Sequence, residues 1–231
     1  MVGCTSQPFT LVYLVETKEE TVGDVLGFLG FTKAIKYNAA LADNIDTEIK
    51  SVFGDDLAKI ITPDMVKSNY PTLEAAVLAG NWPTVGEARG KFIFCMEGAA
   101  EQIYLNGHPS LQDRVMFLKS TPGNPEAAFV VEDDATEKIN DIKREVNAGY
   151  IVRTRADGTN NQNKTGDNSQ MNNAFLSGAQ IVSTDYYRPD PRYKTSPGMF
   201  KDYFCKFPNN DLARINPISA ANKQGIGKIA E

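Results

Sequence analysis

The sequence predicts an α/β fold in which parallel strands alternate with helices. Short apolar runs rich in β-branched and aromatic residues, the first of them residues 9–16 (FTLVYLVE), have the composition of strands buried on both faces of a sheet. Helical patterns separate these runs, and the clearest of them, residues 136–147, stops at Gly149. Because a strand, a helix and a further strand pair in parallel through a right-handed crossover, we expect an α/β sheet or barrel.

Composition narrows the class of protein. The 231 residues are 42% hydrophobic, which is enough apolar surface for one large ordered core. Twenty-four Lys and Arg against 29 Asp and Glu give a net charge of −5, which argues against a nucleic-acid partner because no basic field is available. No apolar run approaches the roughly 20 residues of a transmembrane helix, so peripheral contact is the form of membrane association left open.

Cysteines and the first residues of the chain leave the compartment undecided. Cys4, Cys95 and Cys205 are widely spaced and lie in no CxxC or Cys/His cluster, which argues against a zinc site and leaves their disulfide state open. Residues 1–10 lack the charged start and apolar block of a secretory signal. The localisation is therefore open, and a secreted parent protein is one alternative.

The remaining elements follow from local patterns. Apolar residues recur at three- and four-residue steps through 21–54, which predicts a helix that Gly27 and Gly30 break in two. Further helices are expected to start near Thr62 and Thr72 and over residues 168–177. Five more apolar runs have strand length: residues 91–96, 115–118, 127–131, 150–154 and 179–184. We expect one domain over residues 1–217 and a flexible tail over 218–231.

Polar residues that directly follow the strand runs are the candidates for a site, because the active site of a parallel barrel lies at the carboxyl ends of its strands. Three places qualify. They are residues 16–18 at the end of the first run, with Glu16 and Lys18, residues 153–157 after the YIV run, with Arg153 and Arg155, and residues 183–186 at the end of the last run, with Asp185.

A set of longer motifs, in a fixed order, carries a family resemblance. These motifs are residues 81–91 (NWPTVGEARGK), 107–111 (GHPSL), 153–157 (RTRAD), 175–186 (FLSGAQIVSTDY) and 213–217 (ARINP). Together they resemble the calcium-dependent phosphoinositide-specific phospholipase C family, from about Phe9 to about Pro217. The resemblance implies a PLC-like phosphodiesterase TIM (β/α) barrel.

The resemblance also implies roles for the strand-end residues. A phosphodiester next to a hydroxyl would be the substrate, Ca²⁺ the cofactor and Glu16 a calcium ligand. Lys18 and Arg155 would hold the phosphate as catalytic groups. Substrate-binding roles would fall to three further residues: Arg153, Asp185 and Tyr187. From the residues alone, Glu16 is equally a partner of Lys18 or Lys33, Arg153 a structural strand residue, Asp185 a turn cap and Tyr187 a rim residue.

The sequence also lacks residues that the family uses for catalysis. Its barrel begins with strands that carry two histidines, which act as base and acid, and nothing before Phe9 has room for them. The sole histidine, His108, lies in a Gly-Pro loop. We therefore expect an incomplete barrel of about five or six strands, missing its first strands, and an inactive chain.

Two alternatives stay open for the function. One is a pseudoenzyme that binds a phosphate or a lipid headgroup, such as that of a phosphoinositide, without turnover. The other is an enzyme similar to glycerophosphodiester phosphodiesterases, because a strand-ending Glu-x-Lys also suits their related barrel.

Overall fold

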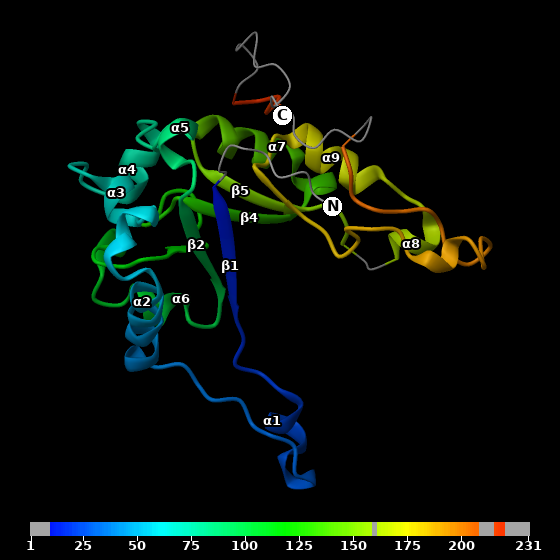
Figure 1. The fold of residues 1–231 in the computed structure, drawn as a ribbon, viewed down its shortest axis with the longest axis horizontal. Coiled ribbons are helices and arrows are strands. Elements are labelled where there is room, and N and C mark those ends of the chain that lie inside the picture. Colours follow the sequence, from blue (N-terminus) through cyan, green and yellow to red (C-terminus); the bar gives the residue numbers. More distant parts are fainter. Residues whose placement is uncertain (1–9, 159–160, 208–214, 220–231) are drawn as a thin grey trace. The chain divides into compact units, whose positions relative to one another are not determined.

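The computed structural model of the chain describes residues 10–158, 161–207 and 215–219. They form two compact units, Met1–Phe129 and Val130–Glu231, each of which is described by itself. The expected alternation of strands and helices is confirmed (Figure 1). The described strands form two separate three-stranded sheets in which no barrel closure is seen, so the barrel stays a prediction.

Unit 1 is built on a parallel sheet in the order β1-β2-β3. Its strands are β1 (Leu11–Thr17), β2 (Phe92–Gly98) and the short β3 (Phe117–Leu118). β1 and β2 pair along their whole length, from Leu11 opposite Phe92 to Thr17 opposite Gly98. Their carboxyl ends therefore lie side by side.

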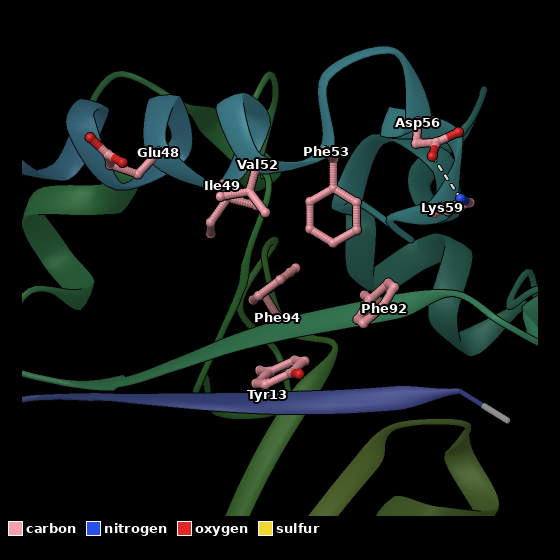
Figure 2. Close-up of a pocket in the computed structure, with 9 residues that line it drawn as sticks. All are labelled: Tyr13, Glu48, Ile49, Val52, Phe53, Asp56, Lys59, Phe92 and Phe94. Carbon is pink, nitrogen blue, oxygen red and sulfur yellow. Dashed lines mark hydrogen bonds and ion pairs between the residues drawn. The ribbon is translucent and has the colours of Figure 1, made fainter.

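The two faces of this sheet have different roles because side chains alternate along a strand. Tyr13 stacks on Phe94 with 5.4 Å between ring centroids, and Phe53 of α2 (Ala39–Phe53) meets Phe92 edge-on at 5.0 Å. Figure 2 shows these rings between α2 and the two strands. Glu16, an odd number of residues from Tyr13, lies on the opposite face.

β1 differs from the strand expected from its composition. Its residues from Leu11 to Leu14 are partly exposed, whereas the apolar run predicts burial on both faces. The physical reason is its position: among the described residues β1 pairs with β2 alone and lies at the edge of the sheet.

The helix expected over residues 21–54 breaks at Gly27 and Gly30 as predicted, but it does not resume directly after Gly30. The chain forms α1 (Val22–Leu26) and one 3₁₀ turn, η1 (Gly27–Leu29), which ends at Gly30 in the left-handed region at φ 86°. An extended stretch follows, and α2 begins only after Asn38, whose side chain accepts a hydrogen bond from Leu41 N. Glycine and the capping asparagine thus override the helical periodicity.

Short helices complete unit 1. They are η2 (Gly54–Lys59), α3 (Pro63–Lys67), α4 (Leu73–Leu78), α5 (Val85–Ala88), α6 (Glu101–Leu105) and η3 (Pro109–Leu111). The expected starts at Thr62 and Thr72 are confirmed, because both hydroxyls cap the helix that follows.

A buried polar network ties α2 to the rest of unit 1. Asp46 accepts hydrogen bonds from the Tyr104 hydroxyl and from Arg114 Nη1, the latter at 3.2 Å. Arg114 Nε donates to the Tyr104 carbonyl oxygen at 2.7 Å, and Met116 N donates to the Tyr104 hydroxyl at 3.0 Å. The network joins α2, α6 and the chain leading into β3, because its buried polar groups accept from and donate to one another.

Unit 2 repeats the strand and helix alternation. Its elements are β4 (Phe129–Asp134), α7 (Ala135–Ala148), β5 (Ile151–Arg155), α8 (Gln162–Thr165), α9 (Ser169–Ser177), β6 (Ile181–Ser183) and η4 (Pro191–Tyr193). The sheet order is β4-β5-β6, with β5 parallel to β6. The expected stop of α7 is confirmed, since Gly149 follows it at φ 105°. Most of the expected tail, residues 220–231, lies outside the described residues.

The two described cysteines are thiols. Cys95 is buried and Cys205 half-buried, and both are free, while Cys4 lies outside the described residues. Burial raises the pKa of the Cys205 thiol to about 11, so it stays protonated at neutral pH.

We predict that the stability of unit 2 depends on pH through Glu145 of α7. Glu145 is buried, its Oε2 has no hydrogen-bond partner, and burial together with the charge of Glu132 raises its pKa to about 7. The folded state therefore holds this proton more tightly than the unfolded state, whose ordinary pKa is 4.5. Stability should fall by about 2 kcal/mol as the pH rises from 4.5 through 7.

Glu145→Gln should remove that fall, measured by urea unfolding at both ends of this pH range. Glu137→Gln, on an exposed residue of the same helix, is the control and should keep the fall. An unchanged pH dependence in Glu145→Gln would contradict the assignment.

Candidate functional site

The carboxyl end of β1 carries an exposed ion pair. Lys18 Nζ lies 3.2 Å from Glu16 Oε1, and the two side chains are 72% and 57% exposed. The sequence leaves Lys18 and Lys33 open as partners of Glu16, and in the structure the partner is Lys18. An ion pair this exposed is weak, so both groups can exchange their partner for a ligand at little cost.

Thr17 holds this strand end in place beneath the ion pair. It is buried, its hydroxyl donates to the Glu97 carbonyl oxygen at 3.1 Å, and the same hydroxyl accepts from Ala100 N at 3.0 Å. Gly98 lies at φ 114°, and a Cβ there would come within 2.2 Å of the Thr17 carbonyl oxygen. Only glycine therefore allows β1 and β2 to close together at this end.

Two further charged residues lie at the same end, and the sequence reasoning missed both. Glu97 stands opposite Glu16 in the β1–β2 register, and Lys119 Nζ lies 2.9 Å from Glu97 Oε1. Lys119 directly follows β3. The strand-end rule that selects Glu16 also selects these residues, because Glu97 directly follows the predicted strand at 91–96 and Lys119 directly follows the predicted strand at 115–118.

Among the described residues, no complete set of calcium ligands accompanies Glu16, the one ligand that the resemblance implies. Calcium takes about six to eight oxygen ligands. Glu16 and Glu97 supply at most four carboxylate oxygens, and each carboxylate is engaged by a lysine. No group of three or more His, Cys, Asp or Glu in the described part of the chain is arranged to hold a metal ion.

In unit 2, the carboxyl ends of β5 and β6 carry a second ion pair. Arg155 Nη2 lies 3.3 Å from Asp185 Oδ2, with Arg155 half-buried and Asp185 exposed. Asp157 lies fully buried behind the pair. Its carboxylate accepts hydrogen bonds from the Thr184 hydroxyl and, at 3.0 Å, from Asp185 N. Asp157 thereby fixes the backbone that presents Asp185.

Arg153 and Tyr187, both expected to bind substrate, lie in different surroundings. Arg153 Nη1 lies 2.7 Å from Asp133 Oδ1 at the end of β4. This ion pair fits the structural role that the sequence leaves open for Arg153. Tyr187 is exposed, and the Arg188 guanidinium lies 5.4 Å from its ring centroid. Their roles toward a substrate stay predictions.

The neighbouring Tyr186 is an anchor. Its hydroxyl donates to Asn163 Oδ1 at 3.3 Å, and its ring meets Tyr203 edge-on at 5.3 Å. Burial raises its pKa, with a further contribution from the charge of Asp157, so the hydroxyl stays protonated. Tyr186 therefore holds the chain after β6 rather than acting as a base.

His108 lies in the turn after α6, where its Nδ1 is 2.8 Å from the Gln112 carbonyl oxygen. A carbonyl oxygen only accepts, so this ring nitrogen carries the proton. The histidine is thus held by its own loop.

Each candidate pair is complete within its own unit: Glu16 with Lys18 in unit 1, and Arg155 with Asp185 in unit 2. Convergence of all four side chains at one mouth stays a prediction.

We predict that Asp157→Ala destabilises unit 2 by about 2 kcal/mol, because it removes a buried acceptor and leaves two part-buried donors, from Thr184 and Asp185, without their partner. Asp185→Ala is the matched control and should cost less than about 1 kcal/mol, since it removes only an exposed ion pair. Urea unfolding followed by circular dichroism measures both. Equal losses in the two variants would contradict the anchoring role of Asp157.

The chain is similar to known proteins in sequence and in structure. The family described as "Phosphoinositide phospholipase C, Ca2+-dependent" matches residues 5–217. No curated protein matches the chain.

Two solved structures are similar. A Ca²⁺-dependent phosphatidylinositol-specific phospholipase C from Streptomyces antibioticus is 16% identical with a TM-score of 0.49, over 77% of this chain and 64% of that one. A calcium-dependent phosphoinositol-specific phospholipase C from Pseudomonas sp. is 13% identical with a TM-score of 0.40, over 63% of this chain and 50% of that one. The chain thus spans less than two thirds of either relative. On the family match, which extends over most of its sequence, this chain belongs to the calcium-dependent phosphoinositide phospholipase C family.

Proposed function

We propose that the chain supplies the phosphate-holding part of a phospholipase C-type phosphodiesterase barrel, and that these 231 residues alone bind the headgroup without turning it over. One observation carries the proposal: cations stand at the carboxyl ends of parallel strands in both units, each beside an exposed carboxylate. The cations are Lys18 and Arg155.

These pairs suit a phosphodiester of a polyol. The guanidinium of Arg155 offers two parallel N–H donors to the phosphate oxygens, and the ammonium of Lys18 offers a point charge. The neighbouring carboxylates of Glu16 and Asp185 hold the cations in position and accept hydrogen bonds from ring hydroxyls. Binding and orientation are therefore the tasks that these side chains can perform.

Turnover requires groups of another kind. Cleavage next to a hydroxyl needs a base for the attacking hydroxyl and an acid for the leaving oxygen. The sequence holds a single histidine, His108, whose Nδ1 is engaged by its own loop. In the family, calcium would lower the pKa of the attacking hydroxyl, but the described residues do not complete its site.

We predict that the chain binds myo-inositol 1-phosphate and that Arg155→Lys and Lys18→Ala each weaken binding about tenfold, because each removes charge-assisted hydrogen bonds. Isothermal titration calorimetry measures this. Arg144→Lys and Lys59→Ala are the matched controls, because both residues also form exposed ion pairs. Neither lies at the carboxyl end of a strand: Arg144 belongs to α7 and Lys59 to η2. Equal weakening in the controls would contradict the site. Binding of glycerol 1-phosphate more tightly than myo-inositol 1-phosphate would favour a protein similar to glycerophosphodiester phosphodiesterases.

A turnover assay tests the second half of the proposal. With calcium and phosphatidylinositol, this chain should release no headgroup above background, because each missing acid or base group typically contributes about 10²- to 10⁴-fold. A rate matching that of a complete phospholipase C measured in parallel would contradict it.

A further inference from the structure

The side of β1 that faces away from β2 is an open sheet edge. Among the described residues β1 pairs with β2 alone. The backbone groups of Leu11 and Thr17 bond on the β2 side, to the residues that directly precede and follow that strand. Because the direction of these groups alternates along a strand, Val12, Leu14 and Glu16 turn their N–H and C=O groups to the free edge. Such a row of donors and acceptors can pair with a further strand.

This edge lacks the features that keep the sheet edges of other proteins apart. The seven residues of β1 include no proline, glycine or lysine, and no bulge interrupts the pairing with β2. Four apolar residues in succession are exposed at its start: Leu11, Val12, Tyr13 and Leu14. Since proteins ordinarily protect an exposed edge with charge, proline or a bulge, an edge this long and apolar is a surface for strand pairing.

The edge is complementary to itself. Two copies of β1 that run antiparallel about a two-fold axis at Tyr13 place Val12 opposite Leu14 of the other copy, and Leu11 opposite Val15. Val12 and Leu14 both turn their backbone groups outward, so they exchange hydrogen bonds across the axis. Tyr13 then forms the closer, non-hydrogen-bonded pair with its own copy. Every exposed apolar residue of the edge thus meets an apolar partner.

Charge permits this pairing. The chain carries a net charge of −5, so two copies repel each other in general. From Thr10 to Lys18, however, the single acidic residue, Glu16, is balanced by Lys18 at 3.2 Å. In the antiparallel register Glu16 lies opposite Thr10 of the other copy, so no like charges meet. A neutral, apolar edge on an acidic protein suits another copy of itself better than a charged partner.

The ring of Tyr13 provides a further contact. It stacks on Phe94 with 5.4 Å between centroids and 15° between planes, yet Tyr13 is 49% exposed (Figure 2). Its second stacked neighbour, Phe92, also belongs to β2, so both contacts lie on the β2 side. A two-fold axis perpendicular to the sheet brings Tyr13 of the other copy to the same face. The two rings then extend the aromatic stack across the edge.

We propose that the chain forms a symmetric dimer in which two β1 strands pair antiparallel about a two-fold axis at Tyr13. The pairing joins the two β1-β2-β3 sheets into one, and the occupant of the edge is a second copy of the chain. The inference goes beyond the proposed function and does not rest on it. Because the paired strands run in opposite directions, the two Glu16–Lys18 pairs lie at opposite ends of the joined strands.

Sedimentation equilibrium of the full chain tests the dimer. Val12→Lys and Leu14→Glu should each weaken dimerisation about tenfold or more, because each places a charge against an apolar partner in both halves of the edge. The double variant Val12→Lys, Leu14→Glu should recover most of that loss, because each lysine then lies opposite a glutamate of the other copy. Recovery also shows that the single variants are folded.

Val85→Lys is the matched control, because it makes the same change at an exposed valine away from the edge. Val85 is 77% exposed and belongs to α5. This variant should leave the dissociation constant of the dimer unchanged.

Cysteine cross-linking reads the register directly. Tyr13→Cys should form a disulfide between copies under mild oxidation, because the Cα atoms of a non-hydrogen-bonded pair lie about 4.5 Å apart. Leu11→Cys should not, because Leu11 lies opposite Val15 and far from Leu11 of the other copy. The natural cysteines are the same in both variants, so their background cancels in the comparison.

Several outcomes overturn the proposal. They are a chain that stays monomeric at every concentration measured, a dimer that Val12→Lys weakens no more than Val85→Lys does, a double variant as weak as the single ones, and equal cross-linking at positions 11 and 13. A monomer that becomes a dimer when residues 1–9 are removed also overturns it, by making the chain's own first residues the occupant of the edge.

Discussion

Parallel pairing of β1 with β2 is the constraint on which unit 1 depends. The pairing runs without interruption to Thr17 opposite Gly98, so both strands end at one edge, where the chain leaves β1 toward α1. The stacking of Tyr13 on Phe94 fixes the register, because a shift by one residue would turn these rings away from α2 and Glu16 toward it. Aromatic packing on one face thereby determines where the charged groups lie on the other.

In both units, buried polar residues stabilise a strand end while exposed charged residues beside them are available for a ligand. Buried polar groups hold the frame: Thr17 in unit 1 and Asp157 in unit 2 both satisfy backbone donors at a strand end. Exposed ions such as Lys18 stand just beyond them. A buried acceptor is costly to remove, whereas an exposed pair contributes little to stability and is available for a ligand. Stability and binding are thus carried by different residues a few positions apart.

The sequence predicted the elements whose signals are local and missed those that depend on a distant partner. The strands were predicted because apolar, β-branched runs identify them, and the capping threonines Thr62 and Thr72 identified two helices. The helix expected over 21–54 breaks at Gly27 and Gly30 as predicted, but periodicity does not register that the chain stays non-helical from Gly30 to the capping Asn38. Glu97 directly follows a predicted strand and could have been selected by the strand-end rule; what no local pattern contains is its place opposite Glu16, which is set by pairing across some eighty residues.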